Sequence, residues 1–279
     1  MTASDRNRHF WTFDTASSIP DNGFDDSMPP ISRDTTMKVT IAYIEEPPFG
    51  WTNADRTAAG ADLDLADAVL RAMGVTRIEH HLTTFSELLP GVEAGRWDMN
   101  VPLFVTPGRA ELVAFSVPVW AIGDGFLVRA GNPKALDSYA SLAERHDARL
   151  GIIAGQVQHD SARTAGVSDD QIVIFEHQAD AIEAVRAGAI DAYASTALGN
   201  RILADRIGGT VLQAVEHRPD APGKRQERPL GAFSFNRTNR DLLDAVNEQL
   251  RLYLGSPDHR ARMASFGLTH NEIDPVLAG

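Results

Sequence analysis

The chain has 279 residues, of which 43% are hydrophobic and 23% are charged, a balance typical of a globular protein with one large or two modest domains. It contains no cysteine, which excludes disulfides, thiol catalysis and thiolate metal sites. The formal net charge of −12 argues against nucleic acid and anionic membranes as partners, because both demand a basic face. No apolar run approaches the length of a membrane-spanning helix, so we expect no membrane insertion. We also expect a monomer.

The first 36 residues are polar, acidic and rich in proline and serine. A secretory signal needs a basic start followed by an apolar stretch, and a restart at Met37 does not create one either. We therefore expect a cytoplasmic location. We assign residues 1–36 to an N-terminal extension. It is either a flexible leader or the product of a misplaced start codon, or it packs onto the domain through Phe10, Trp11 and Phe13.

Strands and helices alternate along the first half of the chain. The hydrophobic patterns predict strands over residues 38–44, 77–82 and from Asp98 onward, separated by helices over 63–73 and 86–94, the second capped by Ser86. Gly74 and Gly95 stand where a glycine commonly ends a helix. The β-α-β-α-β order implies a mostly parallel sheet with helices on both faces.

A weak internal repeat indicates a second unit of similar build. The pattern V-x-A-G-x-x-D occurs at residues 92–98 and again at 185–191, each time after an apolar helical face. A strand over 149–153 and a helix from Gln158 open this second unit. A strand over 230–235 leads back to the first, followed by a helix for which Thr238 and Asp241 form a capping box.

These elements predict an α/β protein of two Rossmann-like lobes with mixed, mostly parallel sheets joined by a two-strand hinge. We assign residues 37–127 and 233–279 to lobe 1 and residues 128–232 to lobe 2. Residues 125–129 would be the outgoing crossover. Two crossovers make a hinge, and a hinge implies a ligand cleft between the lobes.

Candidate ligand contacts follow the strands of the first lobe. The segment Glu-Pro-Pro-Phe-Gly-Trp at 46–51 comes directly after the first strand, where ligands bind in open α/β sheets. It is either a rigid turn that covers the surface or an aromatic wall, with Phe49 presented by two prolines and Glu46 as its charged partner. Phe85 and Phe104 follow the next strands at the same edge; each is either a core residue or part of a box that attracts a cation.

Further polar groups point to a carboxylate or hydroxyl on the ligand. Arg109 could bind a carboxylate through two parallel hydrogen bonds. Gln156 and Val157 lie in a turn before a helix, where backbone N–H groups can hold an anion. Thr196 follows the second repeat and is expected to face the cleft.

Signals for catalysis and for metal binding are weak. His159 could act as a general acid or base but has no identifiable partner in the sequence. His80 and His81 would point to opposite faces of a strand, which makes them a poor metal pair. We therefore assign no catalytic residue, no cofactor and no metal site.

The order of several motifs resembles a known family. From about Met37 to its end, the chain resembles the type II periplasmic solute-binding proteins of polar amino-acid (family 3) uptake systems. The motifs are Pro48-Phe49, Gly60 with Asp64-Leu65-Ala66, Leu88-Leu89-Pro90-Gly91-Val92 with Ala94-Gly95 and Asp98, Thr106-Pro107-x-Arg109, and Phe115-Ser116-x-Pro118. The resemblance implies export to the periplasm, which conflicts with the amino terminus.

Two departures from the family pattern narrow the expected ligand. Val101, Pro102 and Phe104 occupy places that hold small hydroxyl residues in amino-acid binders. Thr196 occupies the place of the acidic residue that takes the α-ammonium group in those binders.

The pattern is instead similar to the ectoine and hydroxyectoine binding proteins. The matching residues are Glu46 to Phe49, Phe85, Leu103-Phe104 and Arg109, whereas Val157 replaces a threonine. By that resemblance Glu46 would pair with a cyclic amidinium, Arg109 would take the carboxylate, and the three phenylalanines would enclose the ring.

The resulting hypothesis is a solute-binding protein that captures a small zwitterionic ligand, ectoine-like or an amino-acid derivative, for ABC-type uptake through a permease. It is not expected to be an enzyme. Two alternatives remain open at this stage. Cyclohexadienyl dehydratases resemble these binding proteins, and Glu46 or His159 could supply a proton there. A cytoplasmic sensor that presents its closed state to a partner would use the same cleft.

Overall fold

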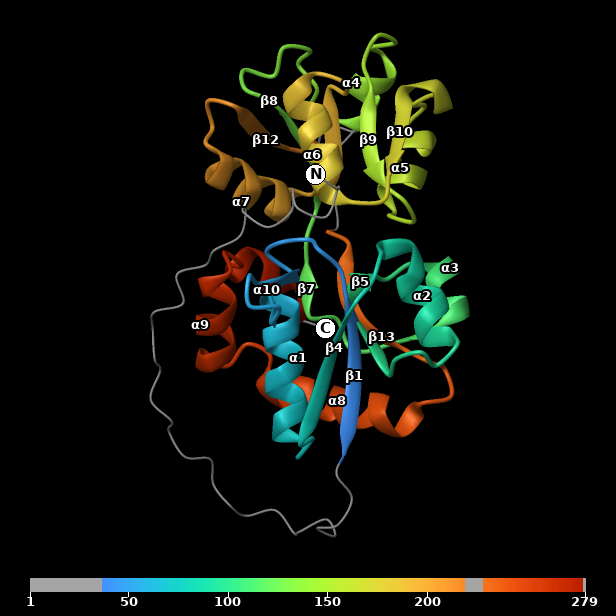
Figure 1. The fold of residues 1–279 in the computed structure, drawn as a ribbon, viewed down its shortest axis with the longest axis vertical. Helices are drawn as coiled ribbons and strands as arrows, with labels where there is room; N and C mark the ends of the chain where they lie inside the picture. The colour runs from blue at the N-terminus through green and yellow to red at the C-terminus, as the bar shows by residue number, and fades with distance from the viewer. Residues whose placement is uncertain (1–36, 219–227, 278–279) are drawn as a thin grey trace.

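A computed structural model describes residues 37–218 and 228–277 of the chain. The predicted extension over residues 1–36 lies outside the described residues. Figure 1 shows two lobes, each built around its own β-sheet, with the chain running from β7 (Trp120–Ala121) in one sheet to β8 (Asp124–Arg129) in the other. The predicted two-lobed α/β fold is confirmed.

The first sheet is mixed. Its strands lie in the order β4-β1-β5-β13-β6, and β7 pairs with β13. The other strands of this sheet are β1 (Lys38–Tyr43), β4 (Arg77–Leu82), β5 (Met99–Phe104), β6 (Ala114–Phe115) and β13 (Leu230–Phe235). Strand β1 runs parallel to β4 and β5, whereas β13 returns from the second lobe and runs antiparallel to β5.

Helices surround the first sheet, and a two-stranded hairpin adjoins it. The helices are α1 (Ala61–Ala72), α2 (Phe85–Glu93), α3 (Pro107–Leu112), α8 (Arg240–Tyr253), α9 (Pro257–Ser265) and α10 (His270–Leu277), and the hairpin strands are β2 (Trp51–Thr52) and β3 (Ala58–Ala59). Two predicted caps are wrong. The N-cap of α2 is Thr84 and not the expected Ser86, and α8 follows Asn239 without a side-chain cap.

The second sheet has the strand order β10-β9-β11-β8-β12. Its remaining strands are β9 (Leu150–Ile153), β10 (Ile172–Phe175), β11 (Ala192–Thr196) and β12 (Leu212–Glu216), and its helices are α4 (Tyr139–Ala143), α5 (Gln158–Thr164), α6 (Gln178–Ala187) and α7 (Ala197–Ile207), with a 3₁₀ turn at Asp169–Gln171. Strand β9 is parallel to β10 and β11, and β8 is antiparallel to both of its neighbours. The lobe boundaries proposed from the sequence stay a prediction.

The internal repeat has a physical basis in both lobes. Gly95 and Gly188 each adopt a left-handed backbone after a helix, with φ of 70° and 73°. The aspartate three residues later then accepts a backbone N–H at the start of the neighbouring strand: Asp98 from Thr40 at 2.7 Å and Asp191 from Arg149 at 2.9 Å. The same helix-to-strand connection therefore aligns the sheet of each lobe.

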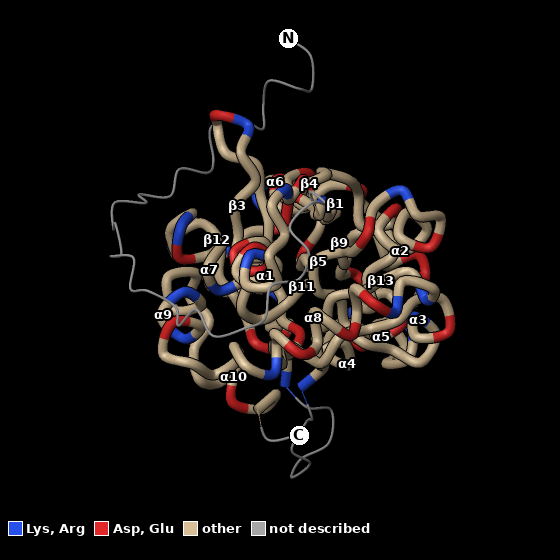
Figure 2. The backbone as a smooth tube through the Cα atoms, turned by 90° about the horizontal axis from the view of Figure 1, so that it is seen from below, with Lys and Arg blue, Asp and Glu red and all other residues tan. Residues whose placement is uncertain are grey.

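Charged residues are spread over the outside of the molecule. In the view of Figure 2, acidic and basic segments alternate around the rim. Within the described part of the chain, no helix is both long and apolar enough to cross a membrane.

A glycine fixes the position of the loop that follows β1. Gly60 has a φ of +139°, which L-residues with a side chain rarely adopt, and a Cβ added there would overlap the backbone carbonyl of Phe49. The backbone N–H groups of Ala61 and Asp62 donate to the carbonyls of Pro48 and Phe49 at 2.9 and 3.1 Å. The start of α1 is therefore packed directly against the 46–51 loop.

We expect Gly60→Ala to lower the free energy of unfolding by about 2 kcal/mol or more, since the new Cβ meets backbone in a strained conformation. Urea denaturation measures this loss. Gly74→Ala is the matched control, because Gly74 also has a positive φ, +84°, but open space around its Cβ. Equal losses in the two variants would show that the close approach to Phe49 does not matter.

Candidate ligand-binding site

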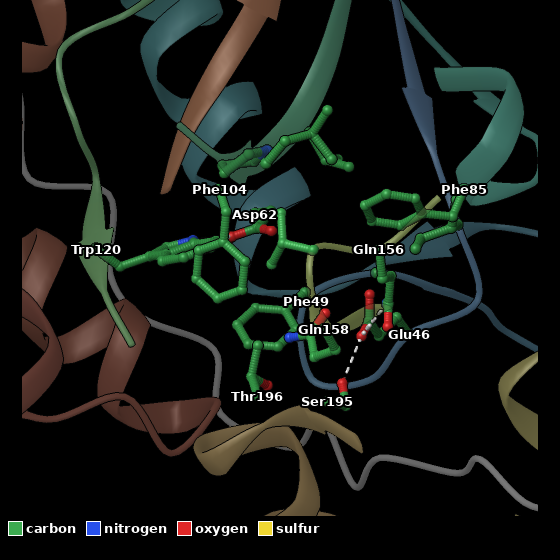
Figure 3. A pocket seen from close by; sticks show the side chains of 16 residues that line it. Glu46, Phe49, Asp62, Phe85, Phe104, Trp120, Gln156, Gln158, Ser195 and Thr196 are labelled. Atoms are coloured by element: carbon green, nitrogen blue, oxygen red, sulfur yellow. Dashed lines mark hydrogen bonds between the residues drawn. The ribbon is translucent and has the colours of Figure 1, made fainter. Parts of the chain in front are cut away.

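A cavity lies between the two lobes at the carboxyl edge of the first sheet. Figure 3 shows its side chains. Its lining residues are Ile44, Glu46, Phe49, Gly50, Asp62, Phe85, Val101, Pro102, Leu103, Phe104 and Trp120 from the first lobe, and Gln156, Val157, Gln158, Ser195 and Thr196 from the second. Of the eight residues predicted from the sequence, seven line this cavity, and Arg109 lies beside it.

Glu46 is held in the cavity by a tight loop. Its backbone carbonyl accepts the N–H groups of Phe49 and Gly50 at 2.9 and 3.2 Å, and the peptide bond between Pro47 and Pro48 is cis. The loop returns at once toward α1, so both the carboxylate of Glu46 and the ring of Phe49 point into the cavity (Figure 3). The loop is thus a tight turn that buries Phe49 in the wall of the cavity and does not lay it over the surface.

The carboxylate of Glu46 is bound from the opposite lobe. Ser195 Oγ and Gln156 Nε2 both donate to Glu46 Oε1, at 3.0 and 3.2 Å. Among the described residues, no lysine, arginine or histidine forms an ion pair with it. Burial raises the pKa of Glu46, and the two hydrogen bonds oppose that rise. Within the described ranges, the site therefore holds a carboxyl group without a positive partner.

Aromatic rings form one wall of the cavity. The ring of Trp120 lies 5.8 Å from that of Phe49 and 5.4 Å from that of Phe104, the latter pair edge to face. Phe85 lies on the other side of the cavity, near Gln156 (Figure 3). Sequence reasoning missed Trp120. The only available signal was its position two residues after the Phe-Ser-x-Pro motif.

Asp62 is a second acidic group that sequence reasoning missed. It is 2% exposed, in the first turn of α1, and its Oδ1 accepts Trp120 Nε1 at 3.1 Å. Burial raises the pKa of Asp62 well above its usual range, and the charge of Glu46 adds to the rise. The family pattern drew attention to Asp64 instead, but two residues along a helix point to opposite faces. Asp64 faces outward and pairs with Arg262 at 3.4 Å.

The guanidinium of Arg109 lies at the edge of the cavity. It donates to the carbonyl of Phe104 at 2.9 Å and, across the lobes, to that of Gly155 at 3.0 Å. It also lies over the ring of Phe85, 5.3 Å from its centroid. Burial lowers the pKa of Arg109 to about 10, and the charge of Asp160 opposes this.

Arg109 lines a second cleft that adjoins the first. The two clefts share Gln156 and Val157 as a common wall. Val157 contributes an apolar surface to that wall, and Gln156 links it to Glu46.

Several polar groups of the second lobe face the cavity. Thr196 caps α7 by accepting the N–H of Gly199 at 3.1 Å, and its side chain lines the cavity. Gln158 donates to Asp124 at 2.8 Å. The side-chain oxygens of Gln156 and Gln158 are buried and accept no hydrogen bond from the described residues.

None of the described histidines lines this cavity. His159 lies 3.6 Å from Asp160 and lines neither cleft. His80 pairs with Asp67 at 2.8 Å, whereas His81 stacks on Trp97. In the described ranges, no group of three or more histidine, aspartate or glutamate side chains is arranged to hold a metal ion.

Solved structures share this fold. The crystal structure of EhuB in complex with hydroxyectoine aligns with a TM-score of 0.76 at 25% identity, covering 87% of this chain and 91% of that one. An ancestral arginine-binding protein bound to arginine aligns with a TM-score of 0.70 at 22% identity, covering 82% of this chain and 97% of that one. An ancestral amino acid-binding protein described as a precursor of cyclohexadienyl dehydratase gives the same TM-score of 0.70 at 22% identity, covering 82% and 95%.

Sequence relatives agree with the fold. A probable amino-acid ABC transporter periplasmic-binding protein from Sinorhizobium fredii is 34% identical over 241 residues, which cover 85% of this chain and 79% of the relative. The family model for bacterial extracellular solute-binding proteins, family 3, matches residues 39–256. The expected cytoplasmic location is wrong, because the matching family consists of extracellular proteins and the relative is a periplasmic-binding protein. The chain belongs to the bacterial extracellular solute-binding proteins of family 3.

Proposed function

We propose that this protein captures a compact zwitterion of the ectoine or hydroxyectoine kind between its lobes and presents it to an ABC permease. One observation carries the proposal. The half-buried Glu46 lines the cavity together with aromatic rings, and no cationic side chain of the described residues pairs with its carboxylate. A ligand that brings a positive charge would supply the missing partner.

The energetics favour such a ligand. A buried charge is costly unless it is paired and hydrogen-bonded. The two hydrogen bonds from Ser195 and Gln156 meet only part of that need. An amidinium or ammonium group near Glu46 would also lie against the rings of Phe49, Phe104 and Trp120. A desolvated cation gains about 2 kcal/mol from such a ring face.

The carboxylate of the ligand would bind at Arg109. This guanidinium makes two hydrogen bonds to carbonyl oxygens, which leaves N–H groups of its five for another acceptor. It lies in the cleft that shares Gln156 and Val157 with the cavity. A zwitterion would therefore place its cation at Glu46 and its anion at Arg109.

Ligand binding would be coupled to closure of the lobes. Glu46 contacts Ser195 and Gln156 across the cleft, and Arg109 contacts Gly155 across the same cleft. A ligand held by Glu46 and Arg109 thus touches the groups that join the lobes. Such a ligand would favour the closed arrangement of the lobes over the open one. A permease could then recognise the closed, ligand-bound protein.

We propose binding without turnover. The relatives are solute-binding proteins. One of the two groups expected to move a proton in a dehydratase, His159, does not line the cavity. The solved structure related to cyclohexadienyl dehydratase is itself described as an amino acid-binding protein.

The ligand is tested first by thermal unfolding in the presence of ectoine, hydroxyectoine, glycine betaine, arginine, glutamate and prephenate. A ligand at a hundred times its dissociation constant stabilises the folded state by about 2.7 kcal/mol, which corresponds to a shift of several degrees. We expect ectoine or hydroxyectoine to give the largest shift. A shift with glutamate alone would contradict the proposed pocket.

We expect Glu46→Gln to weaken binding of the ligand by about thirtyfold or more, because removing one member of a buried charge pair costs about 2–5 kcal/mol. Isothermal titration calorimetry measures the affinity. Glu45→Gln is the matched control, because Glu45 is the adjacent acid but bonds Thr52, outside the cavity. An unchanged affinity in Glu46→Gln would remove the buried cation from the proposal.

The raised pKa of Glu46 predicts a pH dependence in the ligand-free protein. A carboxyl group whose pKa is higher in the folded state stabilises the fold fully below its unfolded pKa, about 4.3, and loses that contribution as the pH rises through the folded value. Urea unfolding between pH 4 and pH 8 should therefore show the wild type losing stability relative to Glu46→Gln. A difference that does not change with pH would argue against a raised pKa.

A further inference from the structure

Several side-chain oxygen atoms around the cavity accept no hydrogen bond from the described residues. Both hydrogen bonds to Glu46 go to Oε1, and the hydrogen bond to Asp62 goes to Oδ1. Within the described part of the chain, the second oxygen of each carboxylate accepts nothing. The side-chain oxygens of Gln156 and Gln158 are buried without a donor among those same residues. Four acceptors of three residue types are thus left over around one cavity.

Four hydrogen-bond donor atoms of the cavity already donate to carboxylates. Trp120 Nε1 donates to Asp62, Ser195 Oγ and Gln156 Nε2 donate to Glu46, and Gln158 Nε2 donates to Asp124. Buried acceptors without donors are costly, and native structures seldom keep them. A ligand with N–H or O–H groups would supply donors to the two buried glutamine oxygens and to the second oxygens of Glu46 and Asp62.

Asp62 is held in a fixed position by its surroundings. Its backbone N–H donates to the carbonyl of Phe49 at 3.1 Å, and its side chain is held by the indole of Trp120. Figure 3 shows its carboxylate beside Phe104, on the side of the cavity away from Ser195. Glu46 and Asp62 thus approach the enclosed space from two directions.

We propose that Asp62 is a second acidic contact of the same ligand and that the site selects a cation with N–H groups pointing in at least two directions, such as an amidinium or a guanidinium. The inference rests on the proposed function and specifies its ligand class. A quaternary ammonium could lie against the rings of Phe49, Phe104 and Trp120. It has no N–H group to donate to the carboxylate and amide oxygens. A site built around hydrogen bonds rejects a ligand that lacks them far more strongly than one built on apolar contact.

The experiment compares three probes that all carry a carboxylate and differ in their cation: ectoine with an amidinium, arginine with a guanidinium, and glycine betaine with a quaternary ammonium. Calorimetry measures their affinities for the wild type, Asp62→Asn and Asp64→Asn. Asp64 is the matched control, because it lies in the same helical turn but pairs with Arg262 outside the cavity. Asparagine keeps an acceptor for Trp120, so the fold is expected to survive.

We expect ectoine or arginine to bind the wild type at least tenfold more tightly than glycine betaine does. Asp62→Asn should weaken that binding at least tenfold, and Asp64→Asn should change it less than twofold. Equal affinity of wild type and Asp62→Asn, or glycine betaine as the tightest probe, would overturn the inference while leaving the zwitterion-binding function in place.

Failure of all three probes to bind would count against the proposed function, and the role of Asp62 is then decided without a ligand. Urea unfolding at pH 8 compares Asp62→Asn with the wild type. Greater stability of the variant supports the inference that the Asp62 carboxylate lacks a positive partner until a cationic ligand binds. Lower stability shows that Asp62 serves the fold through Trp120 and overturns the inference.

Discussion

The carboxylate of Glu46 is carried by a stiff loop at the edge of one sheet and receives its two hydrogen bonds from Ser195 and Gln156 of the other lobe. A charge in this position must be neutralised, protonated or paired, because burial disfavours its ionised form. Asp62, buried in the same cavity, adds to that demand. The lobes therefore enclose an acidic space whose electrostatic balance depends on what enters it, and this gives a physical reason for ligand-linked closure.

The scaffold supports this arrangement by repeating one connection. In each lobe a helix ends at a left-handed glycine, and an aspartate three residues later, Asp98 or Asp191, aligns the next strand. The carboxyl edge of the first sheet then supplies Glu46 and the aromatic rings. The second lobe supplies hydrogen-bond donors at the ends of β9 and β11. Because Gly60 lets α1 pack against the 46–51 loop, the same contact places Asp62 in the cavity that Glu46 lines.

The acidic groups of the site lie in the first lobe, unlike the acidic residue of the amino-acid binders. The family pattern expects an acid at position 196 of the second lobe, where this chain has Thr196. The two carboxylates of the cavity instead come from the first lobe, at Glu46 and Asp62. Under the proposed function, the positive end of the ligand would bind the first lobe, and the second lobe would contribute neutral contacts. Arg109 remains in the first lobe and reaches across to Gly155.

Much of the fold follows from the sequence alone, because strand alternation, helix-ending glycines and the V-x-A-G-x-x-D repeat are local signals. The aromatic part of the site could also be predicted, because residues that follow successive parallel strands meet at one edge of the sheet. The sequence did not predict Asp62, Trp120, Gln158 or Ser195 as cavity residues. Their positions depend on helical phase and on how the two lobes face each other, which no local spacing encodes. Arg109 illustrates the same limit: its residue type indicated an anion contact, whereas only the tertiary structure showed that two backbone carbonyls from different lobes already orient its guanidinium.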